Sequence, residues 1–211
     1  MNIIIVGGGS KFGKFVSDEF NKLEHNVYIL SHQNYGNENP NHLYADFRNI
    51  TEVTSVFKSI VEKVDTLDLF LYVSSFDDGP KTPEHYQVNN TGNIEKMWNN
   101  TLRVNVVIPH ELSLIALEKT TKNSKIVFMT SGLAEDFDER KHFFSYAAYA
   151  GCKAALSHLM IALAHNNEEL VCALSPHFPD EEDLKIKKYQ ETFDRLISLT
   201  NDDKGKIIRL Y

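Results

Sequence analysis

The sequence predicts one α/β domain in which helices cover both faces of a mainly parallel, seven-stranded sheet. Short runs rich in Val, Ile and aromatic residues recur along the 211 residues, and segments with helical spacing separate them. Several of these runs are continuously apolar, which is typical of strands buried on both faces of a parallel sheet. Right-handed crossovers between such alternating elements give a doubly wound, three-layer α/β/α domain.

The expected elements follow in order from these runs. Strands are predicted at "NIIIV", "NVYIL", "HLYAD", "LDLFLYV", "KIVFM", "ELVCAL" and "KIIRL", which are residues 2–6, 26–30, 42–46, 67–73, 125–129, 169–174 and 206–210. Apolar residues at helical spacing predict helices at 13–24, 51–64, 92–119, 146–166 and 181–199. The segment 75–91, which holds two prolines and a glycine, is expected to be a long loop. Loops at the carboxyl ends of such strands carry the ligands.

The composition of the chain argues against several classes of protein. A formal net charge of -7 without a basic run argues against a protein that binds nucleic acid or anionic membranes, since these need clustered Lys and Arg. The apolar run at 2–6 is too short for a signal-peptide core, and no run approaches the roughly 18 apolar residues of a membrane span. Cys152 and Cys172 match neither a metal-ligand pattern nor a disulfide framework, which fits a reducing compartment. We expect a soluble, cytoplasmic, single-domain protein over residues 1–211 that binds no metal.

The stretch "VGGGSKFGKFV" places Gly7, Gly8, Gly9 and Gly13 where the first strand meets the first helix. Glycines there let the backbone turn tightly and let a pyrophosphate approach the amides at the helix N-terminus, where the helix dipole favours negative charge. The alternative is a plain tight turn. The position of the glycine-rich stretch directly after the first strand favours a dinucleotide site of the Rossmann type.

The end of the second strand bears on the choice of dinucleotide. The usual acid, which binds a ribose 2′-hydroxyl, is missing, because "ILSHQN" offers Ser31, His32 and Gln33 instead. This difference disfavours NAD and leaves room for the 2′-phosphate of NADP. Lys11 and the imidazole of His32 are candidates to face that phosphate, and Lys11 is alternatively a solvated surface lysine.

The stretch "SYAAYAGCKAAL" holds two tyrosines and a lysine on one expected helix. Positions i and i+4 of a helix share a face, so Tyr149 and Lys153 are neighbours, whereas Tyr146 is nearly two turns from Lys153. Tyr149 is therefore the tyrosine expected to act with Lys153. The alternative is a buried tyrosine that lies beside a cation.

Separated segments, in the right order, resemble the short-chain dehydrogenase/reductase family over nearly the whole chain. The glycine loop is similar to TGxxxGxG, with Gly7 and Gly13 on its first and last glycines, and "YADFRN" resembles the stretch whose aspartate holds the adenine amino group. "VNVVIPHELSLIAL", "KIVFMTSGLA" and "YAAYAGCKAAL" are similar to the segments that carry the catalytic asparagine, serine and YxxxK pair. "ALSPHFP" resembles the segment that touches the nicotinamide.

The resemblance implies hydride transfer between a nicotinamide and a carbonyl or secondary alcohol, with Asn105, Ser131, Tyr149 and Lys153 as catalytic residues. Tyr149 is expected to be the acid/base, while Lys153 favours the phenolate and holds the nicotinamide ribose hydroxyls. Ser131 would stabilise charge on the substrate oxygen, and Asn105 would hold a water that links Lys153 to solvent. The alternative for Ser131 is a strand-end serine that binds a backbone group, and the alternative for Asn105 is an ordinary polar residue in a helix.

The same resemblance implies a set of residues that bind NADP or NAD: Gly7, Gly9, Ser10, Lys11, Phe12, Gly13, Ser31, His32, Asp46, Phe47, Ser74, Ser75, Tyr149, Lys153 and Pro176. The glycine loop and the carboxyl ends of the second, fourth and sixth expected strands supply most of them.

The sequence also departs from the family pattern. Lys11 stands at the second glycine, "YVSS" at 72–75 replaces NNAG, and His177 follows Pro176 where a glycine is usual. Only 29 residues separate Pro176 from Lys206, so the segment that covers the substrate is short or absent. The connection between Ser131 and Tyr149 is long, and its Phe137, Phe143 and Phe144 either line a pocket or pack ordinarily. These departures permit an alternative function, a nucleotide-binding sensor or scaffold that keeps the fold.

The segment "AGCKAALSHLMIALAH" has apolar residues on more than one side of its expected helix. One side carries Ala155, Leu159 and Ala162, and another carries Leu156, Met160 and Leu163. A helix that covers only one sheet keeps a polar outer stripe. Proteins of the family associate through this helix and the one near 96–119, so we expect a homodimer or homotetramer that acts on a small carbonyl or alcohol.

Overall fold

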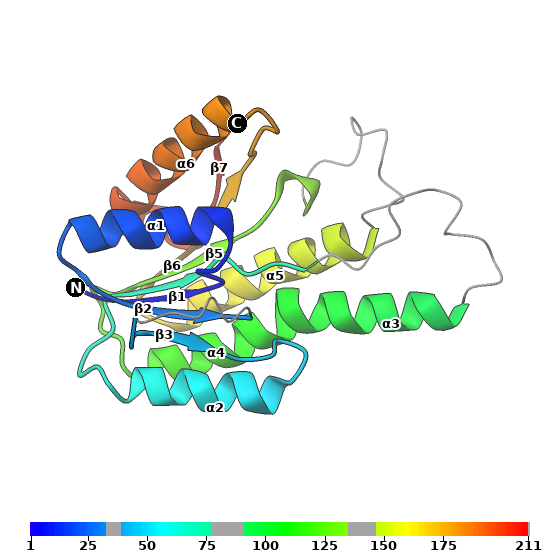
Figure 1. Cartoon of the computed structure of the whole chain (residues 1–211), viewed down its shortest axis with the longest axis horizontal. Coiled ribbons are helices and arrows are strands. Elements are labelled where there is room, and N and C mark those ends of the chain that lie inside the picture. Colours follow the sequence, from blue (N-terminus) through cyan, green and yellow to red (C-terminus); the bar gives the residue numbers. More distant parts are fainter. Residues whose placement is uncertain (33–38, 77–90, 135–146, 211) are drawn as a thin grey trace.

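All seven strands form one parallel sheet in the order β3-β2-β1-β4-β5-β6-β7. The computed structural model describes residues 1–32, 39–76, 91–134 and 147–210 (Figure 1). The strands are β1 (Asn2–Val6), β2 (Asn26–Ser31), β3 (His42–Tyr44), β4 (Leu69–Tyr72), β5 (Lys125–Met129), β6 (Leu170–Pro176) and β7 (Ile207–Leu210). The prediction of a doubly wound, seven-stranded sheet is confirmed.

Helices cover the sheet on both sides. They are α1 (Lys11–Lys22), α2 (Ile50–Val61), α3 (Thr91–Leu102), a π-helix (Arg103–Val107), α4 (Ile108–Leu117), α5 (Ala147–Asn166) and α6 (Glu182–Ile197), with short 3₁₀ turns at Gly132–Ala134 and Asn201–Asp203. In Figure 1, α1 and α6 lie over one face, and α2, α4 and α5 lie over the other. This arrangement gives the expected three layers.

The strand β1 shows why its apolar run is continuous. Ile3 and Ile5 pack into the core beneath α1 and α6, whereas Ile4 and Val6 pack into the core beneath α2, α4 and α5. Successive side chains of a strand point to opposite faces, and here both faces are covered. Each fully buried Ile contributes about 1.5–3 kcal/mol relative to an exposed one. A polar residue at any of these positions would therefore open one of the two cores.

The strands β2 and β3 are added outward from β1 on one side, and β4 to β7 are added outward from β1 on the other side. The strand order therefore changes direction at β1, which pairs with β2 on one side and β4 on the other. Val6 at the end of β1 lies opposite Leu30 and Tyr72, so the carboxyl ends of these three strands are level. A ligand crevice in an open parallel sheet lies at such a reversal. The topology thus places the glycine loop beside the ends of β2 and β4.

The long helix predicted at 92–119 is interrupted. α3 ends at Leu102, the π-helix follows, and α4 begins at Ile108 with Pro109 in its first turn. Proline has no backbone N–H, so the regular α-helical bond that residue 109 would donate cannot form. Most of the predicted loop 75–91 lies outside the described residues.

One described helix, α5, is long and apolar enough to cross a membrane by length and composition alone. Half of it is buried inside the fold. Its Leu156, Met160 and Leu163 belong to the core that also contains Phe128 of β5 and Val171 of β6. Packing against the sheet therefore explains the apolar character of this helix.

Candidate functional site

The glycine loop needs its glycines for close backbone contacts. Gly7 has a φ of +92°, and a Cβ there would lie 2.5 Å from the backbone nitrogen of Ser74. A Cβ at Gly13 would lie 2.5 Å from the carbonyl oxygen of Gly7. Side chains at these positions would separate the loop from the end of β4 or from the first turn of α1. The loop thus has the compact form that a phosphate-binding turn requires.

The N-terminus of α1 opens beside this loop. Ser10 caps the helix, since its Oγ accepts a hydrogen bond from the backbone N–H of Gly13 at 3.0 Å. The first turn of α1 contains no acidic residue that would neutralise the positive end of the helix dipole. The nearby carboxylate belongs to α6, where Glu182 Oε1 lies 3.5 Å from Lys11 Nζ.

A cavity of about 380 Å³ lies next to this helix end. It is lined by residues that lie within or next to α1, β4, β5, α5, β6 and α6: Ser10, Lys11, Phe12, Val73, Ser75, Met129, Thr130, Ser131, Tyr149, Lys153, Pro176, His177, Phe178 and Tyr189. The structure thus brings the predicted Ser131, Tyr149 and Lys153 together with the loop residues Ser10 and Lys11.

Lys153 is buried, with 1% of its surface exposed. Its Nζ donates a hydrogen bond to the carbonyl oxygen of Met129 at 3.0 Å and lies 5.6 Å from the centroid of the Tyr149 ring. Burial lowers the pKa of Lys153 to about 7, because removal from water disfavours the charged ammonium. Near neutral pH, the charge of Lys153 therefore responds to any negative charge that appears beside it.

Ser131 follows β5 and lines the cavity while its Oγ accepts the backbone N–H of Leu133 at 3.3 Å. Both expectations for this residue, a cavity hydroxyl and a partner for a backbone group, are thus compatible with its position. The preceding Thr130 shares a hydrogen bond of 3.0 Å with Ser157, which also donates to the carbonyl oxygen of Lys153 at 3.0 Å. These contacts tie the end of β5 to the middle of α5.

Asn105 lies in the π-helix and is fully buried. Its Nδ2 donates to the carbonyl oxygens of Phe76 at 2.7 Å and Thr101 at 2.8 Å. Its Oδ1 has no hydrogen-bond partner within the described parts of the chain. The structure does not place Asn105 among the residues that line the cavity.

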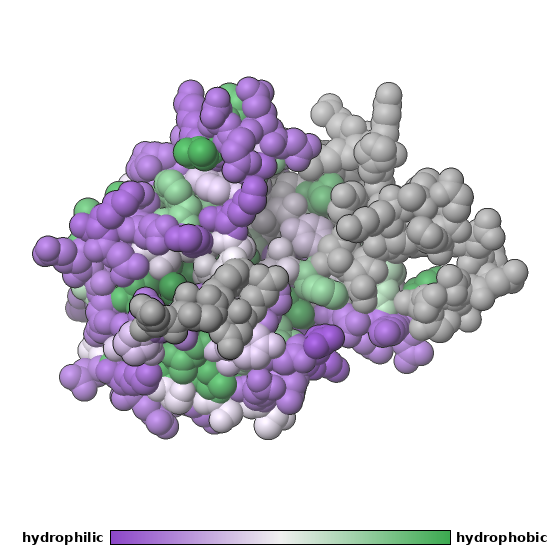
Figure 2. Space-filling view, in the orientation of Figure 1, coloured by the Kyte–Doolittle hydropathy of each residue, from purple (hydrophilic) through white to green (hydrophobic). Residues whose placement is uncertain are grey.

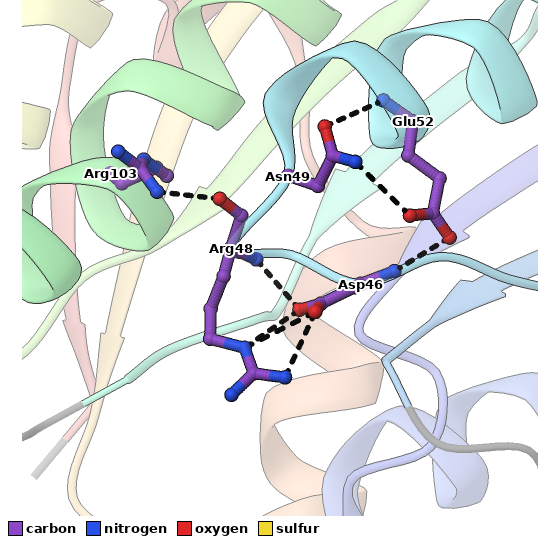
Figure 3. A network of polar contacts seen from close by, with 5 residues as sticks. All are labelled: Asp46, Arg48, Asn49, Glu52 and Arg103. Carbon is purple, nitrogen blue, oxygen red and sulfur yellow. Dashed lines mark hydrogen bonds and ion pairs between the residues drawn. The ribbon is translucent and has the colours of Figure 1, made fainter.

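A second group of predicted residues lies beyond β2 and β3 (Figure 3). The carboxylate of Asp46 accepts four hydrogen bonds from Arg48: one from the backbone N–H at 2.9 Å, two from Nε at 3.0 and 3.2 Å, and one from Nη2 at 2.9 Å. Arg48 lowers the pKa of Asp46 through these bonds. An adenine amino group that binds Asp46 would therefore share the carboxylate with Arg48.

The segment around Asp46 is fixed from two sides. The backbone N–H of Asp46 donates to Glu52 Oε1 at 3.2 Å, and Arg103 Nη1 donates to the carbonyl oxygen of Arg48 at 2.5 Å (Figure 3). Phe47 is buried, and its ring centroid lies 6.1 Å from that of the exposed His32. His32 and Phe47, two of the residues that the resemblance assigns to cofactor binding, thus lie close together.

Ser31 and Lys11 have surroundings that the sequence did not reveal. Ser31 is buried, and its Oγ lies 2.8 Å from His42 Nε2, within hydrogen-bond distance. Lys11 lines the cavity of Tyr149, whereas Lys14 lines a separate cavity of about 370 Å³ beside Gly8, Gly9 and His42. Lys14 thus shares a cavity with Ile29 of β2. Gln33, Phe137, Phe143, Phe144 and Tyr146 lie outside the described residues.

Three aromatic contacts that the sequence did not reveal close one wall of the Tyr149 cavity. The rings of Phe12, Phe178 and Tyr189 have centroid separations of 5.1, 5.3 and 4.8 Å. Residues 177–181 alone connect β6 to α6, so α6 itself supplies Tyr189 to the cavity. The shortness of this connection was visible in the sequence, but the position of α6 was not.

Known proteins provide a further comparison. A family model described as short chain dehydrogenase matches residues 1–176. No curated protein sequence matches the chain significantly. The match to the family model supports a dehydrogenase or reductase role with a nicotinamide cofactor.

Solved structures share the fold at low sequence identity. An oxidoreductase of the short-chain dehydrogenase/reductase type from Brucella ovis has a TM-score of 0.78 and 18% identity, over 100% of this chain and 99% of that one. The aldohexose dehydrogenase of Thermoplasma acidophilum, in ligand-free form, has a TM-score of 0.78 and 15% identity, with 99% and 91% covered. A short chain dehydrogenase from Leptospira borgpetersenii with bound NAD+ has a TM-score of 0.76 and 17% identity, with 99% and 90% covered. The family model covers most of the sequence, and the chain belongs to the short-chain dehydrogenase family.

Proposed function

We propose that the protein is an NAD(P)-dependent oxidoreductase that interconverts a carbonyl compound and a secondary alcohol, with Tyr149 as acid/base. One observation carries the proposal: Ser131, Tyr149 and Lys153 line one cavity with the capped N-terminus of α1. These groups come from the residues that follow β5, from α5 and from the end of the glycine loop, three segments that lie far apart in the chain.

The residues present fit a dinucleotide. The close contacts at Gly7 and Gly13 leave a turn without side chains, and the first turn of α1 offers a positive end without its own carboxylate. Gly7, Gly9, Ser10, Phe12 and Gly13 would hold the pyrophosphate, while Asp46, Phe47 and His32 would hold the adenosine. Ser74, Ser75 and Pro176 would border the nicotinamide half. When bound, the nicotinamide would accept or supply the hydride.

Tyr149 would hold and transfer the proton at its phenol oxygen. Lys153 is buried near the Tyr149 ring, so a negative charge on the phenolate would favour the ammonium, and the ammonium would in turn favour the phenolate. Ser131 would donate a hydrogen bond to the substrate oxygen as charge develops there. Asn105 would use its unpaired Oδ1 to hold a water on the path from Lys153 to solvent.

We further propose that NADP is preferred and that the protein is a cytoplasmic homodimer or homotetramer. In support of NADP, neither Ser31 nor His32 at the end of β2 offers a carboxylate to a ribose 2′-hydroxyl. The substrate would be a small carbonyl or alcohol, because the cavity of about 380 Å³ has to hold the nicotinamide as well.

Calorimetric titration with NADPH and NADH tests the proposal first. We expect binding of at least one dinucleotide, followed by NADPH consumption with a member of a panel of small aldehydes and ketones. Absence of binding by both dinucleotides would refute the proposal. Binding without turnover on a broad panel would instead support the alternative of a nucleotide sensor or scaffold.

A further inference from the structure

The π-helix leaves one backbone carbonyl without a helical donor. Within this turn, the N–H of Ile108 donates to the carbonyl oxygen of Arg103, five residues earlier. An α-helix would instead direct the N–H of Ile108 to the carbonyl of Val104. The next residue, Pro109, has no N–H to offer. The Val104 carbonyl therefore needs a donor from elsewhere, because an unpaired buried carbonyl is unfavourable.

Tyr72 at the end of β4 supplies that donor. Its hydroxyl donates to the carbonyl oxygen of Val104 at 2.5 Å, and its side chain is fully buried. Burial raises the pKa of the Tyr72 phenol, so the hydroxyl keeps its proton and remains a donor at any physiological pH. Tyr72 is also the first residue of the "YVSS" segment that stands in place of the family's NNAG.

The π-helix that Tyr72 holds carries Asn105. The Nδ2 of Asn105 donates to the carbonyl oxygen of Phe76, just beyond β4, so two hydrogen bonds join this turn to the β4 end. Between the two attachment points lies Ser74, whose backbone packs directly against Gly7. A shift of the π-helix would thus move Asn105 and would also disturb the support of the glycine loop.

We propose that Tyr72 is a positioning residue for the site, which fixes the π-helix and thereby the place of Asn105 and of the glycine-loop support. This inference rests on the proposed oxidoreductase function for its effect on turnover. The hydrogen bond from Tyr72 to the Val104 carbonyl, which replaces the donor that Pro109 lacks, does not depend on the proposed function.

The test compares Tyr72→Phe with Tyr28→Phe. Tyr28 is a matched control, because it is buried in the same core, and its phenol oxygen accepts a bond from Asn26 at the opposite end of β2 from the site. We expect backbone amides at 103–108 to exchange with solvent roughly tenfold faster in Tyr72→Phe, because the variant loses the bond to Val104 as well as a side-chain bond between Tyr72 and Ser74. Tyr28→Phe should leave these amides unchanged.

A second substitution, Pro109→Ala, sharpens the test because it restores an N–H five residues after Val104. In the double variant, amide exchange at 103–108 should return towards the wild-type rate. On a carbonyl substrate, Tyr72→Phe should lower kcat by up to about 100-fold, as a misplacement of about 1 Å does, with the KM for the carbonyl substrate unchanged. Pro109→Ala should recover much of that loss.

Three outcomes would overturn the proposal: equal amide exchange in the Tyr72 and Tyr28 variants, no recovery with Pro109→Ala, or faster exchange with unchanged kcat. Amide exchange needs neither substrate nor dinucleotide, so a wild-type protein without turnover would refute the proposed function and leave the bond testable. If Tyr72→Phe does not fold, the comparison is made between Pro109→Ala and its double variant. Faster exchange in that double variant would then contradict the proposal.

Discussion

Tyr149 is half-buried and lines the cavity that Lys153, Ser131 and the α1 N-terminus share. The substitution Tyr149→Phe removes one oxygen and preserves the packing of the ring. We expect the fold and dinucleotide affinity to persist, while turnover falls by about 10²–10⁴-fold, the contribution of a positioned acid/base. Steady-state kinetics on a carbonyl substrate, with NADPH consumption as the readout, measures the change.

The control for this prediction is Tyr146→Phe. Tyr146 precedes Tyr149 by three residues, and by sequence spacing it cannot share a helix face with Lys153 at i+4. Turnover should therefore be nearly unchanged in this variant. Full activity in Tyr149→Phe together with a loss in Tyr146→Phe would show that the catalytic tyrosine has been assigned wrongly.

Lys153 makes stability depend on pH. Its pKa falls from 10.5 to about 7 on burial, so between these values the unfolded chain binds more protons than the folded one. The contribution of Lys153 to the unfolding free energy therefore rises with pH from about 7 to 10.5, and the full penalty of the buried ammonium applies below pH 7. Removal of the amine in Lys153→Met should stabilise the fold near pH 6 by a few kcal/mol, at about 1.4 kcal/mol per pKa unit.

Urea unfolding of wild type and Lys153→Met at pH 6 and pH 9 measures this difference. The advantage of the variant should shrink at the higher pH. The same variant should bind the dinucleotide more weakly and turn over more slowly, because it lacks both the charge beside Tyr149 and the ribose contact proposed for Lys153. A variant less stable than wild type at pH 6 would contradict the assignment of the pKa shift to burial.

At the scale of elements, the end of β2 should set the choice of dinucleotide. We expect NADPH to bind more tightly than NADH, because Ser31 and His32 offer no carboxylate there. The substitution His32→Asp introduces one, which would accept a ribose 2′-hydroxyl and repel a 2′-phosphate. The affinity ratio should shift towards NADH by roughly tenfold or more, equivalent to about 1.4 kcal/mol. Calorimetric titration measures both affinities, and equal or tighter binding of NADH by the wild type would refute the expectation.

Lys11 and Lys14, the first two lysines of α1, lie beside different parts of the proposed dinucleotide site. Lys11 lines the Tyr149 cavity, whereas Lys14 pairs with Asp18 and lines the other cavity. We expect Lys11→Met to weaken NADPH and NADH alike by severalfold, since its ammonium lies by the helix end that would hold the pyrophosphate. Titration of Lys22→Met, in the last turn of α1 and away from both cavities, is the matched control for a lost lysine on this helix. A loss confined to NADPH in Lys11→Met would instead assign Lys11 to the 2′-phosphate.

For the whole molecule, the outer surface suggests where copies of the chain associate. Figure 2 shows mainly hydrophilic residues over α1 and α6. Large apolar side chains are exposed on α3 and α4, where they are Ile94, Trp98, Leu102 and Leu114, and also on α6, where they are Leu184, Ile186 and Ile197. Trp98 also approaches α5, since a Cβ at Gly151 would lie 3.1 Å from its ring. On α5 itself, Leu156, Met160 and Leu163 are buried in the core, while Ala155, Leu159 and Ala162 are not fully covered.

We therefore expect a homodimer or homotetramer that buries the exposed faces of α3, α4 and α5. The substitution Leu114→Glu places a charge on this face and should shift the protein towards single chains, because an unpaired buried charge opposes association. Leu184→Glu, on α6 with a similarly exposed leucine, is the control and should not change the mass. Light scattering at micromolar concentration measures both, and a wild-type mass of one chain would contradict the prediction.

Parts of the site were predictable because they depend on local spacing. The YxxxK spacing predicted that Tyr149 and Lys153 share a helix face, and the strand-end position of Ser131 directed it to the same edge of the sheet. Phe178 belongs to "ALSPHFP", the segment that the resemblance places against the nicotinamide. Tyr189 could not be predicted as a lining residue, because its position depends on how α6 packs against α1, a contact between segments far apart in the chain.

The sequence by itself determined the order of strands and helices and the α/β class, because apolar periodicity and glycine-rich turns act over a few residues. Only the tertiary structure decided three features of the site: Arg48 occupies the Asp46 carboxylate, Tyr72 pairs with the carbonyl that the π-helix exposes at Val104, and α6 closes the cavity. The first arises between neighbouring residues, but it depends on the path of the chain after β3. The other two depend on long-range packing, in which a side chain meets a partner that no local pattern specifies.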